Sequence, residues 1–168
     1  MNAIGNATIE EVTSCFENEN SESEGQKKSQ SFGWCTDQLN RLRRRVGQWK
    51  LAEVSKDDML GIKVETGHNH SIPGSEALIR AGQTVGEAVI QLRALDPETM
   101  PECWRNISHQ KDRDIPQTHL ILKREGGQLW HIDGIHRMLA WLYYEKDGTI
   151  PAFVWETAEV AAGGSSTI

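Results

Sequence analysis

The chain has 168 residues and a formal net charge of −6, and 38% of its residues are hydrophobic. This length allows one ordinary domain with short extensions and excludes a second full catalytic domain. The acidic balance argues against duplex DNA as a partner, because no overall positive field attracts the phosphate backbone. No stretch approaches the ~18 apolar residues of a membrane span and no signal-peptide pattern is visible, so we expect a cytoplasmic protein without membrane contact. The three cysteines are odd in number and far apart, which predicts reduced thiols.

The N-terminal region is predicted to hold a helix and then a linker. Thr8 and Glu11 match a capping box, in which a hydroxyl and a carboxylate each accept a bond from a backbone N–H at a helix start. We therefore assign residues 1–16 to an N-terminal helical segment. Residues 17–31 contain no apolar side chain and are predicted to form a flexible acidic and polar linker.

A second helix is predicted by four apolar residues spaced along one helical face, namely Cys35, Leu39, Leu42 and Val46. Gly47 is expected to end this helix in the left-handed conformation. Four arginines, at 41, 43, 44 and 45, lie on the other side. A solvated face is the simpler interpretation of this cluster, and a nucleic acid or an acidic partner is the alternative.

The next region is predicted to contain one strand and much loop. Residues 48–54 alternate weakly and are expected to form a strand, with a helical turn over 55–60. Residues 61–82 are rich in glycine, so we expect loop there, with a short strand at 77–80.

The third helix is predicted by a second capping box, formed by Thr84 and Glu87. An apolar face follows the box, and Pro97 is expected to stop the helix. Residues 98–117 are rich in charge and proline, and we expect irregular structure there.

The C-terminal third carries the clearest pattern. Two strand-like runs, 118–123 and 128–132, are separated by a turn containing two glycines, which predicts a hairpin. After Asp133 the apolar period changes from 2 to 3.6, which predicts a helix over 135–144. A strand over 149–155 follows, and residues 157–168 are expected to be a frayed tail.

The segment between the second hairpin strand and this helix is typical of an anion site. Asp133 and Gly134 form a turn, and His136 and Arg137 fall in the first turn of the helix. The first N–H groups of a helix lack internal partners and carry the positive end of the macrodipole. Arg137 adds the planar fork that suits phosphate oxygens. The alternative is structural: Asp133 caps the helix and pairs with Arg137, while His136 is exposed or satisfied in the core.

The order of hairpin, Ile-Asp-Gly-Ile-His-Arg turn, helix and Ile-Pro strand resembles the ParB/sulfiredoxin superfamily. The resemblance covers about residues 72–155, and it makes residues 32–156 one ParB/sulfiredoxin-like domain with a helical extension. It implies nucleotide binding at the turn, since sulfiredoxins use ATP, ParB proteins use CTP and related serine kinases use ADP. Gly134, His136 and Arg137 would then bind phosphate. Asp133 and His136 would be the catalytic groups, with Asp133 as the Mg²⁺ contact.

This chain also departs from the superfamily. The turn contains no cysteine, which argues against sulfiredoxin chemistry. It lacks the double arginine of chromosome-segregation proteins, and no helix-turn-helix domain follows. The resemblance therefore implies a stand-alone domain.

A metal site is a second possibility. His68 and His70 are spaced two apart, as are His131 and Asp133, and together with His136 they could form a Zn²⁺ or Fe²⁺ site. Further candidates are scattered: Glu65, Glu76, Asp112 and Asp114 as a base, and Lys111 and Lys123 as second phosphate contacts.

These observations predict an α/β protein with a small mixed sheet, packed helices and an N-terminal helical extension. The leading functional hypothesis is binding of a nucleotide such as ATP or ADP, with Mg²⁺, or of another phosphorylated small molecule, with phosphoryl transfer or hydrolysis as the reaction. The alternatives are a non-enzymatic regulatory or partner-binding module of the same fold and a metal-dependent enzyme.

Overall fold

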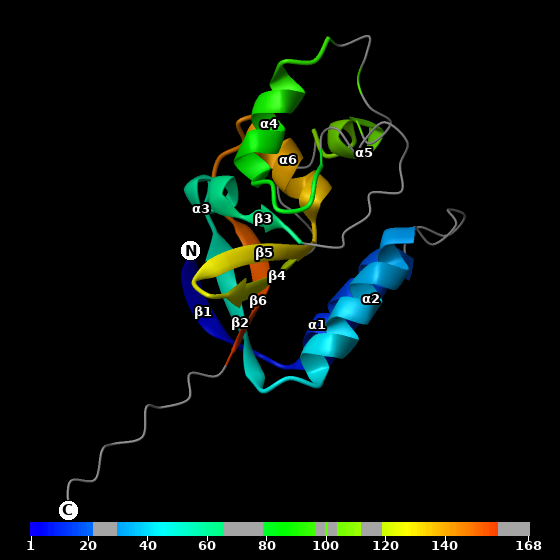
Figure 1. Ribbon diagram of the computed structural model, residues 1–168, viewed down its shortest axis with the longest axis vertical. Coiled ribbons are helices and arrows are strands. Elements are labelled where there is room, and N and C mark those ends of the chain that lie inside the picture. Colours follow the sequence, from blue (N-terminus) through cyan, green and yellow to red (C-terminus); the bar gives the residue numbers. More distant parts are fainter. Residues whose placement is uncertain (22–29, 66–78, 97–99, 101–103, 112–118, 158–168) are drawn as a thin grey trace, which may run out of the picture.

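The computed structural model describes residues 1–21, 30–65, 79–96, 100, 104–111 and 119–157, with only the backbone course given at 19–21 and 30–32. Its helices and strands are arranged as in Figure 1. In chain order they are β1 (Asn2–Ala7), α1 (Ile9–Ser21), α2 (Gln30–Arg43), β2 (Gly47–Val54), α3 (Lys56–Gly61), β3 (Lys63–Val64), α4 (Val85–Arg93), α5 (Trp104–Ser108), β4 (Leu120–Glu125), β5 (Gln128–Asp133), α6 (Ile135–Tyr143) and β6 (Ile150–Thr157).

The described strands form one mixed sheet of six strands in the order β1-β2-β6-β4-β5-β3. The pairs β1/β2, β2/β6 and β4/β5 are antiparallel, whereas β4/β6 and β3/β5 are parallel. The predicted fold class, an α/β protein with a small mixed sheet and packed helices, is confirmed.

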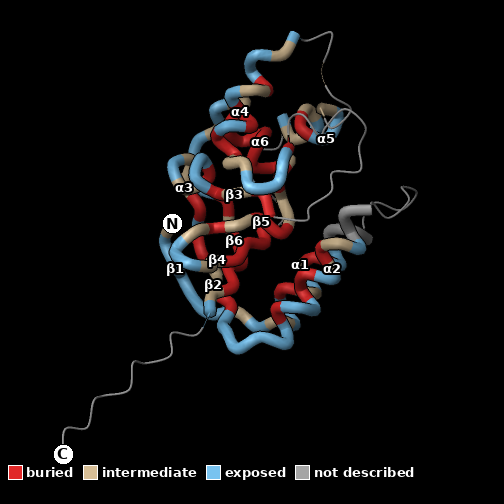
Figure 2. Tube along the Cα trace, viewed as in Figure 1, coloured by how far each residue is buried: buried red, intermediate tan, exposed pale blue. Residues whose placement is uncertain are grey.

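Helices cover both faces of the sheet, and each face has its own buried cluster (Figures 1 and 2). Alternation along β6 shows the division, since Ala152 and Val154 belong to the cluster under α3, α4 and α6, while Phe153 and Trp155 belong to the cluster under α1 and α2. Successive side chains of a strand point to opposite faces, so the two clusters share the strands.

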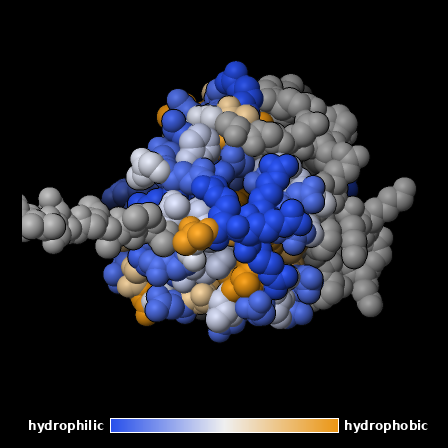
Figure 3. Space-filling model, turned by 60° about the horizontal axis from the view of Figure 1, so that its bottom comes forward, coloured by the Kyte–Doolittle hydropathy of each residue, from blue (hydrophilic) through white to orange (hydrophobic). Residues whose placement is uncertain are grey.

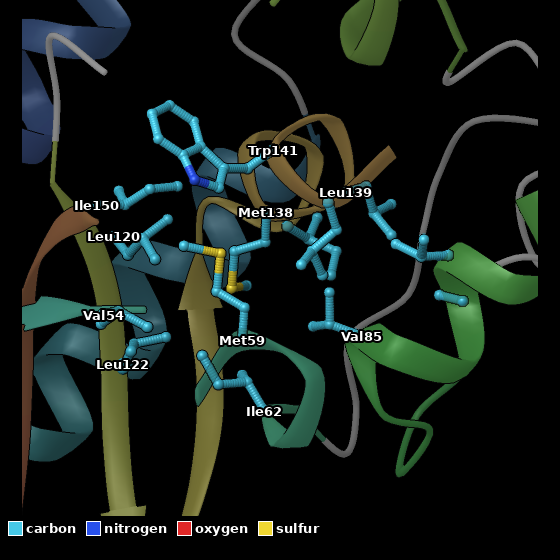
Figure 4. Packing of buried hydrophobic residues seen from close by; sticks show 14 of the residues in the cluster. Val54, Met59, Ile62, Val85, Leu120, Leu122, Met138, Leu139, Trp141 and Ile150 are labelled. Carbon is cyan, nitrogen blue, oxygen red and sulfur yellow. The ribbon is translucent and has the colours of Figure 1, made fainter. Parts of the chain in front are cut away.

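The larger cluster is built around α6. In Figure 4 Met138 projects toward Met59 of α3, Leu139 toward Val85 of α4, and Trp141 lies beside Ile150 of β6. Most of these side chains are fully buried, and burial at ~25 cal/mol per Å² of apolar surface makes this cluster the main source of stability. The helix that begins at the candidate site is thus firmly anchored.

The N-terminal region differs from the prediction in having a strand, in the end of the first helix and in the start of the second. Residues 2–7 form an exposed edge strand, which the sequence did not indicate because this strand has no alternating apolar pattern. The capping box is confirmed, with the N–H groups of Thr8 and Glu11 bonded to the opposite side chains. The helix continues to Ser21, and α2 starts at Gln30, so both ends of the predicted linker are helical. The linker's remainder, 22–29, lies outside the described residues.

The predicted end of the second helix was wrong. The helix stops at Arg43, Val46 is 82% exposed, and Gly47 opens β2 without a positive φ. Glycine is needed there for a different reason, because a Cβ would lie 2.4 Å from the Trp155 ring. Sheet packing rather than helix capping accounts for the residue.

The middle of the chain is partly as predicted. The strand over 48–54, the turn of helix after Ser55 and the capping box of α4 are confirmed. β3 was missed, and Ile79 and Arg80 are not in a strand; 77–78 lie outside the described residues. α4 already ends at Arg93, ahead of Pro97. α5 is a short helix within the stretch predicted to be irregular.

The C-terminal third follows the prediction closely. The hairpin, α6 and β6 are all present, and Gly126 and Gly127 both have positive φ in the hairpin turn. Thr118 and residues 158–168 lie outside the described residues. In the described part of the chain, the helices are too short or too polar to cross a bilayer.

Candidate functional site

The site predicted from the sequence lies where β5 ends and α6 begins. Gly134 is the N-cap of α6, with φ +99°, and it provides no side-chain acceptor for the helix N–H groups. The first helical bond runs from the Met138 N–H to the Gly134 carbonyl at 3.0 Å. The predicted turn between strand and helix is therefore confirmed, whereas Asp133 does not cap the helix.

Gly134 is required by space as well as by conformation. A Cβ at this position would lie 2.5 Å from Leu120 Cδ2 and 3.1 Å from Arg137 Nη2. The Arg137 guanidinium thus packs closely over the Gly134 backbone. A side chain here would push either the core residue or the arginine away.

Arg137 is held by a neighbouring carboxylate. Its Nη2 donates to Asp133 Oδ2 at 2.8 Å, with the Arg137 side chain 10% exposed and the Asp133 side chain 28% exposed. The ion pair joins the last residue of β5 to the first turn of α6 and fixes the guanidinium in place. The pairing considered in the structural alternative is present.

Two histidines lie near this cation. His136, half-buried, is in the first turn of α6. His119, directly before β4, was not singled out in the sequence. Burial lowers the pKa of its imidazole, and the positive charge of Arg137 lowers that pKa further. No sequence signal indicated His119, because its neighbours come from distant segments.

His131 has a structural environment. It is fully buried on β5, and its Nδ1 accepts a hydrogen bond from the Glu65 N–H at 3.0 Å. Its ring also stacks against Trp34 of α2 at a centroid distance of 6.1 Å. Glu65 and Lys123, two other candidates, form a buried ion pair with each other.

Within the described residues, no three His, Cys, Asp or Glu side chains are gathered as a metal site. His68 and His70, the remaining candidate ligands, lie outside the described residues, as do Glu76, Asp112 and Asp114. The metal-dependent alternative therefore stays a prediction.

The comparisons with known proteins give one result. A family model matches residues 1–165. The chain belongs to DUF6309, a family of unknown function. The DUF6309 match includes the N-terminal β1, α1 and α2 together with the turn. No curated protein and no solved structure matched the chain. The resemblance to the ParB/sulfiredoxin superfamily stays a prediction.

Proposed function

We propose that the turn from Asp133 to Arg137 binds the phosphate groups of a nucleotide or of another phosphorylated small molecule. The α6 N-terminus supports this role, since its glycine cap leaves the positive end of a nine-residue helix without a capping side chain. Arg137 and His136 add cationic or hydrogen-bonding groups within the same first turn.

One observation carries the proposal: the Arg137 guanidinium is fixed directly over the start of α6. Its Nη2 lies 3.1 Å from the position that a Cβ of Gly134 would take, and Asp133 Oδ2 holds it at 2.8 Å. A phosphate at this turn would therefore meet the planar fork of Arg137 together with the N–H groups of the first helical turn.

A nucleotide would bring Mg²⁺ as its usual partner. Asp133 fits the role of a single carboxylate contact, because Mg²⁺ is commonly held by one or two carboxylates while phosphates and waters supply the other oxygens. When bound, Mg²⁺ neutralises negative charge on the phosphates during transfer. His136 and Arg137 would contact the reacting phosphate directly, and Asp133 would contact it through Mg²⁺.

The direct test is thermal unfolding of the full chain with ATP, ADP, CTP and inorganic phosphate, each with and without Mg²⁺. A ligand at a hundred times its Kd adds ~2.7 kcal/mol to the stability, which gives a clear rise in Tm. We expect at least one nucleotide to stabilise the protein. The absence of any shift at millimolar concentrations would contradict phosphate binding.

Variants then locate the site. Arg137→Lys keeps the positive charge but removes the planar fork, and His136→Ala removes a neighbouring donor, so both should weaken the stabilisation. Arg93→Lys is the matched control, since Arg93 is a half-exposed arginine at the end of α4 that pairs with Glu145. Asp133→Asn should remove any Mg²⁺ dependence while strengthening the binding of metal-free phosphate. Unchanged binding in a folded Arg137→Ala protein would rule out this site.

A further inference from the structure

Cys15 and His119 lie together although 104 positions separate them in the sequence. The Sγ of Cys15 is 3.7 Å from Nδ1 of His119. Cys15 is on α1, beside the buried residues Val12 and Phe16 that face the sheet, and it is itself only partly buried. The N-terminal helix thus places a thiol against the imidazole.

The imidazole is held in position by the sheet. Its ring stacks on Phe153 of β6, with centroids 4.5 Å apart and planes at 20°. Burial and then the Arg137 charge lower the pKa of His119, so the imidazole is neutral at pH 7 and its Nδ1 can accept a proton. Thiol and base are arranged as in proteins that use cysteine as a nucleophile.

We propose that Cys15 is a nucleophilic thiol, that His119 is the base that takes its proton, and that the pair captures an electrophilic small molecule carrying negative charge. The Cys15 S–H proton moves to His119 Nδ1, and the sulfur electron pair forms a bond to the electrophilic carbon. The leaving group departs with the electrons of its bond to that carbon. The negative charge of the preferred electrophile follows from the place of His119 in the fold. The next residue, Leu120, packs against the Gly134 position, and the Arg137 guanidinium packs against that same position.

Cys35 provides an internal comparison. It is part of the buried cluster against which Cys15 packs, but it is only 3% exposed and its thiol donates to the Ile132 carbonyl at 3.1 Å. Its proton is engaged and its sulfur is shielded. Reactivity of Cys15 without reactivity of Cys35 therefore reports on the native fold.

The test is alkylation of the folded full chain, in a Cys103→Ser background so that two thiols remain. Iodoacetamide and iodoacetate react by the same displacement of iodide but differ in charge. Mass spectrometry of the peptides gives the rate at each cysteine, and the same chain in denaturant provides the reference rate. This reactivity is distinct from phosphate binding, so either proposal can fail while the other holds.

We expect Cys15 in the folded protein to react at least ~10-fold faster than in the denatured chain, a modest share of the ~10²–10⁴-fold that a positioned base can supply. The ratio of the iodoacetate rate to the iodoacetamide rate should also be higher in the folded chain. His119→Asn should return Cys15 to the reference rate, whereas His109→Asn, which changes an exposed histidine after α5, should not. Equal rates in folded and denatured chains, or no effect of His119→Asn, would overturn the proposal.

If His119→Asn unfolds the protein, Cys35 will be alkylated as well. The pH dependence of the Cys15 rate then provides the test in protein that keeps His119. Transfer to a neutral imidazole gives a Cys15 rate that is nearly constant between pH 7 and ~8, below the usual thiol pKa of ~8.5. A rate that only rises with pH, in proportion to free thiolate, would overturn the proposal.

Discussion

Lys123 of β4 and Glu65, which directly follows β3, form an ion pair whose side chains are 11% and 7% exposed. Glu125 is a second carboxylate near the same ammonium group, at 3.2 Å. Since β3 has only two residues, this pair helps to hold the edge of the sheet. Neither residue is therefore available as the phosphate contact or the base considered from the sequence.

Removing one partner of this pair should destabilise the folded protein. Lys123→Met leaves the Glu65 carboxylate buried without its cation, and we expect a loss of about 3–5 kcal/mol in the free energy of unfolding. The double variant Lys123→Met/Glu65→Leu should recover most of that loss, because no buried charge is left. Urea denaturation measures both. A double variant no more stable than the single one would contradict the assignment.

The ion pair between Asp133 and Arg137 should contribute less. Asp133 keeps 28% exposure, so a carboxylate stranded by Arg137→Ala remains in contact with water. We expect a loss of about 1–3 kcal/mol, the usual penalty for leaving a partly buried polar group without its partner. Urea denaturation without ligand measures this loss. A loss clearly above the expected ~1–3 kcal/mol would indicate a purely structural pair.

Gly134→Ala should destabilise the protein at the turn. A left-handed φ costs an L-residue about 1–2 kcal/mol, and the overlap with Leu120 adds about 1–3 kcal/mol. Gly126→Ala is the matched control, because Gly126 also has a positive φ but has open space around it. We expect the first variant to melt well below the second. Equal melting temperatures would show that the Leu120 contact relaxes freely.

The contrast between the two halves of the chain shows what the sequence can predict. The hairpin, α6 and β6 were predicted because local signals agree there, with glycines at the turns and a change of apolar period at Gly134. β1 and β3 were missed, since one is exposed along its length and the other has only two residues. Such edge strands are defined by their neighbours rather than by their own pattern.

The contacts at and around the candidate site also differ in how far they could be predicted. The turn and the pairing of Asp133 with Arg137 follow from adjacent residues, whereas the contacts of Cys15 with His119 and of Lys123 with Glu65 join distant segments. A single sequence, taken by itself, carries no information on such pairs. Likewise, Gly47 was taken for a helix end because the Trp155 ring beside it is more than a hundred positions away.

Glu156 makes the stability of the sheet depend on pH. Burial by itself would raise the pKa of this carboxyl, but Lys50 at 2.6 Å and Arg124 at 3.0 Å outweigh it, and the net pKa is lowered. A lowered pKa stabilises the fold above the ordinary value of 4.5, and this contribution is lost as the pH falls through the folded-state value.

Glu156→Gln should therefore cost about 1 kcal/mol at pH 7, and the difference from the unaltered protein should vanish in acid. Glu53→Gln, on the neighbouring β2, changes the net charge equally at an exposed position and is the control. Urea denaturation at several pH values between 3 and 7 measures the effect. A difference that stays constant over this range would contradict the ion pairs with Lys50 and Arg124.

The arginine cluster consists of the four arginines at positions 41, 43, 44 and 45. The cluster lies where α2 leads into β2, at the lower end of the molecule in Figure 1. Figure 3 brings this end forward and shows a largely hydrophilic surface there. Two members of the cluster are engaged, since Arg43 pairs with Glu10 at 3.0 Å, and Arg45 pairs with Glu125 and lies 4.7 Å from the Trp155 ring centroid. These carboxylates offset part of the positive charge on this face.

We therefore expect only weak, nonspecific binding to duplex DNA, with a Kd no tighter than ~10⁻⁶ M at physiological salt. Fluorescence anisotropy with a random-sequence duplex measures it, and the double variant Arg41→Gln/Arg44→Gln tests the two arginines outside these ion pairs. Glu10→Gln provides the opposite change, because it releases Arg43 from its carboxylate and should strengthen any binding slightly. Submicromolar affinity that disappears in the Arg41→Gln/Arg44→Gln protein would instead make nucleic acid a partner of this face.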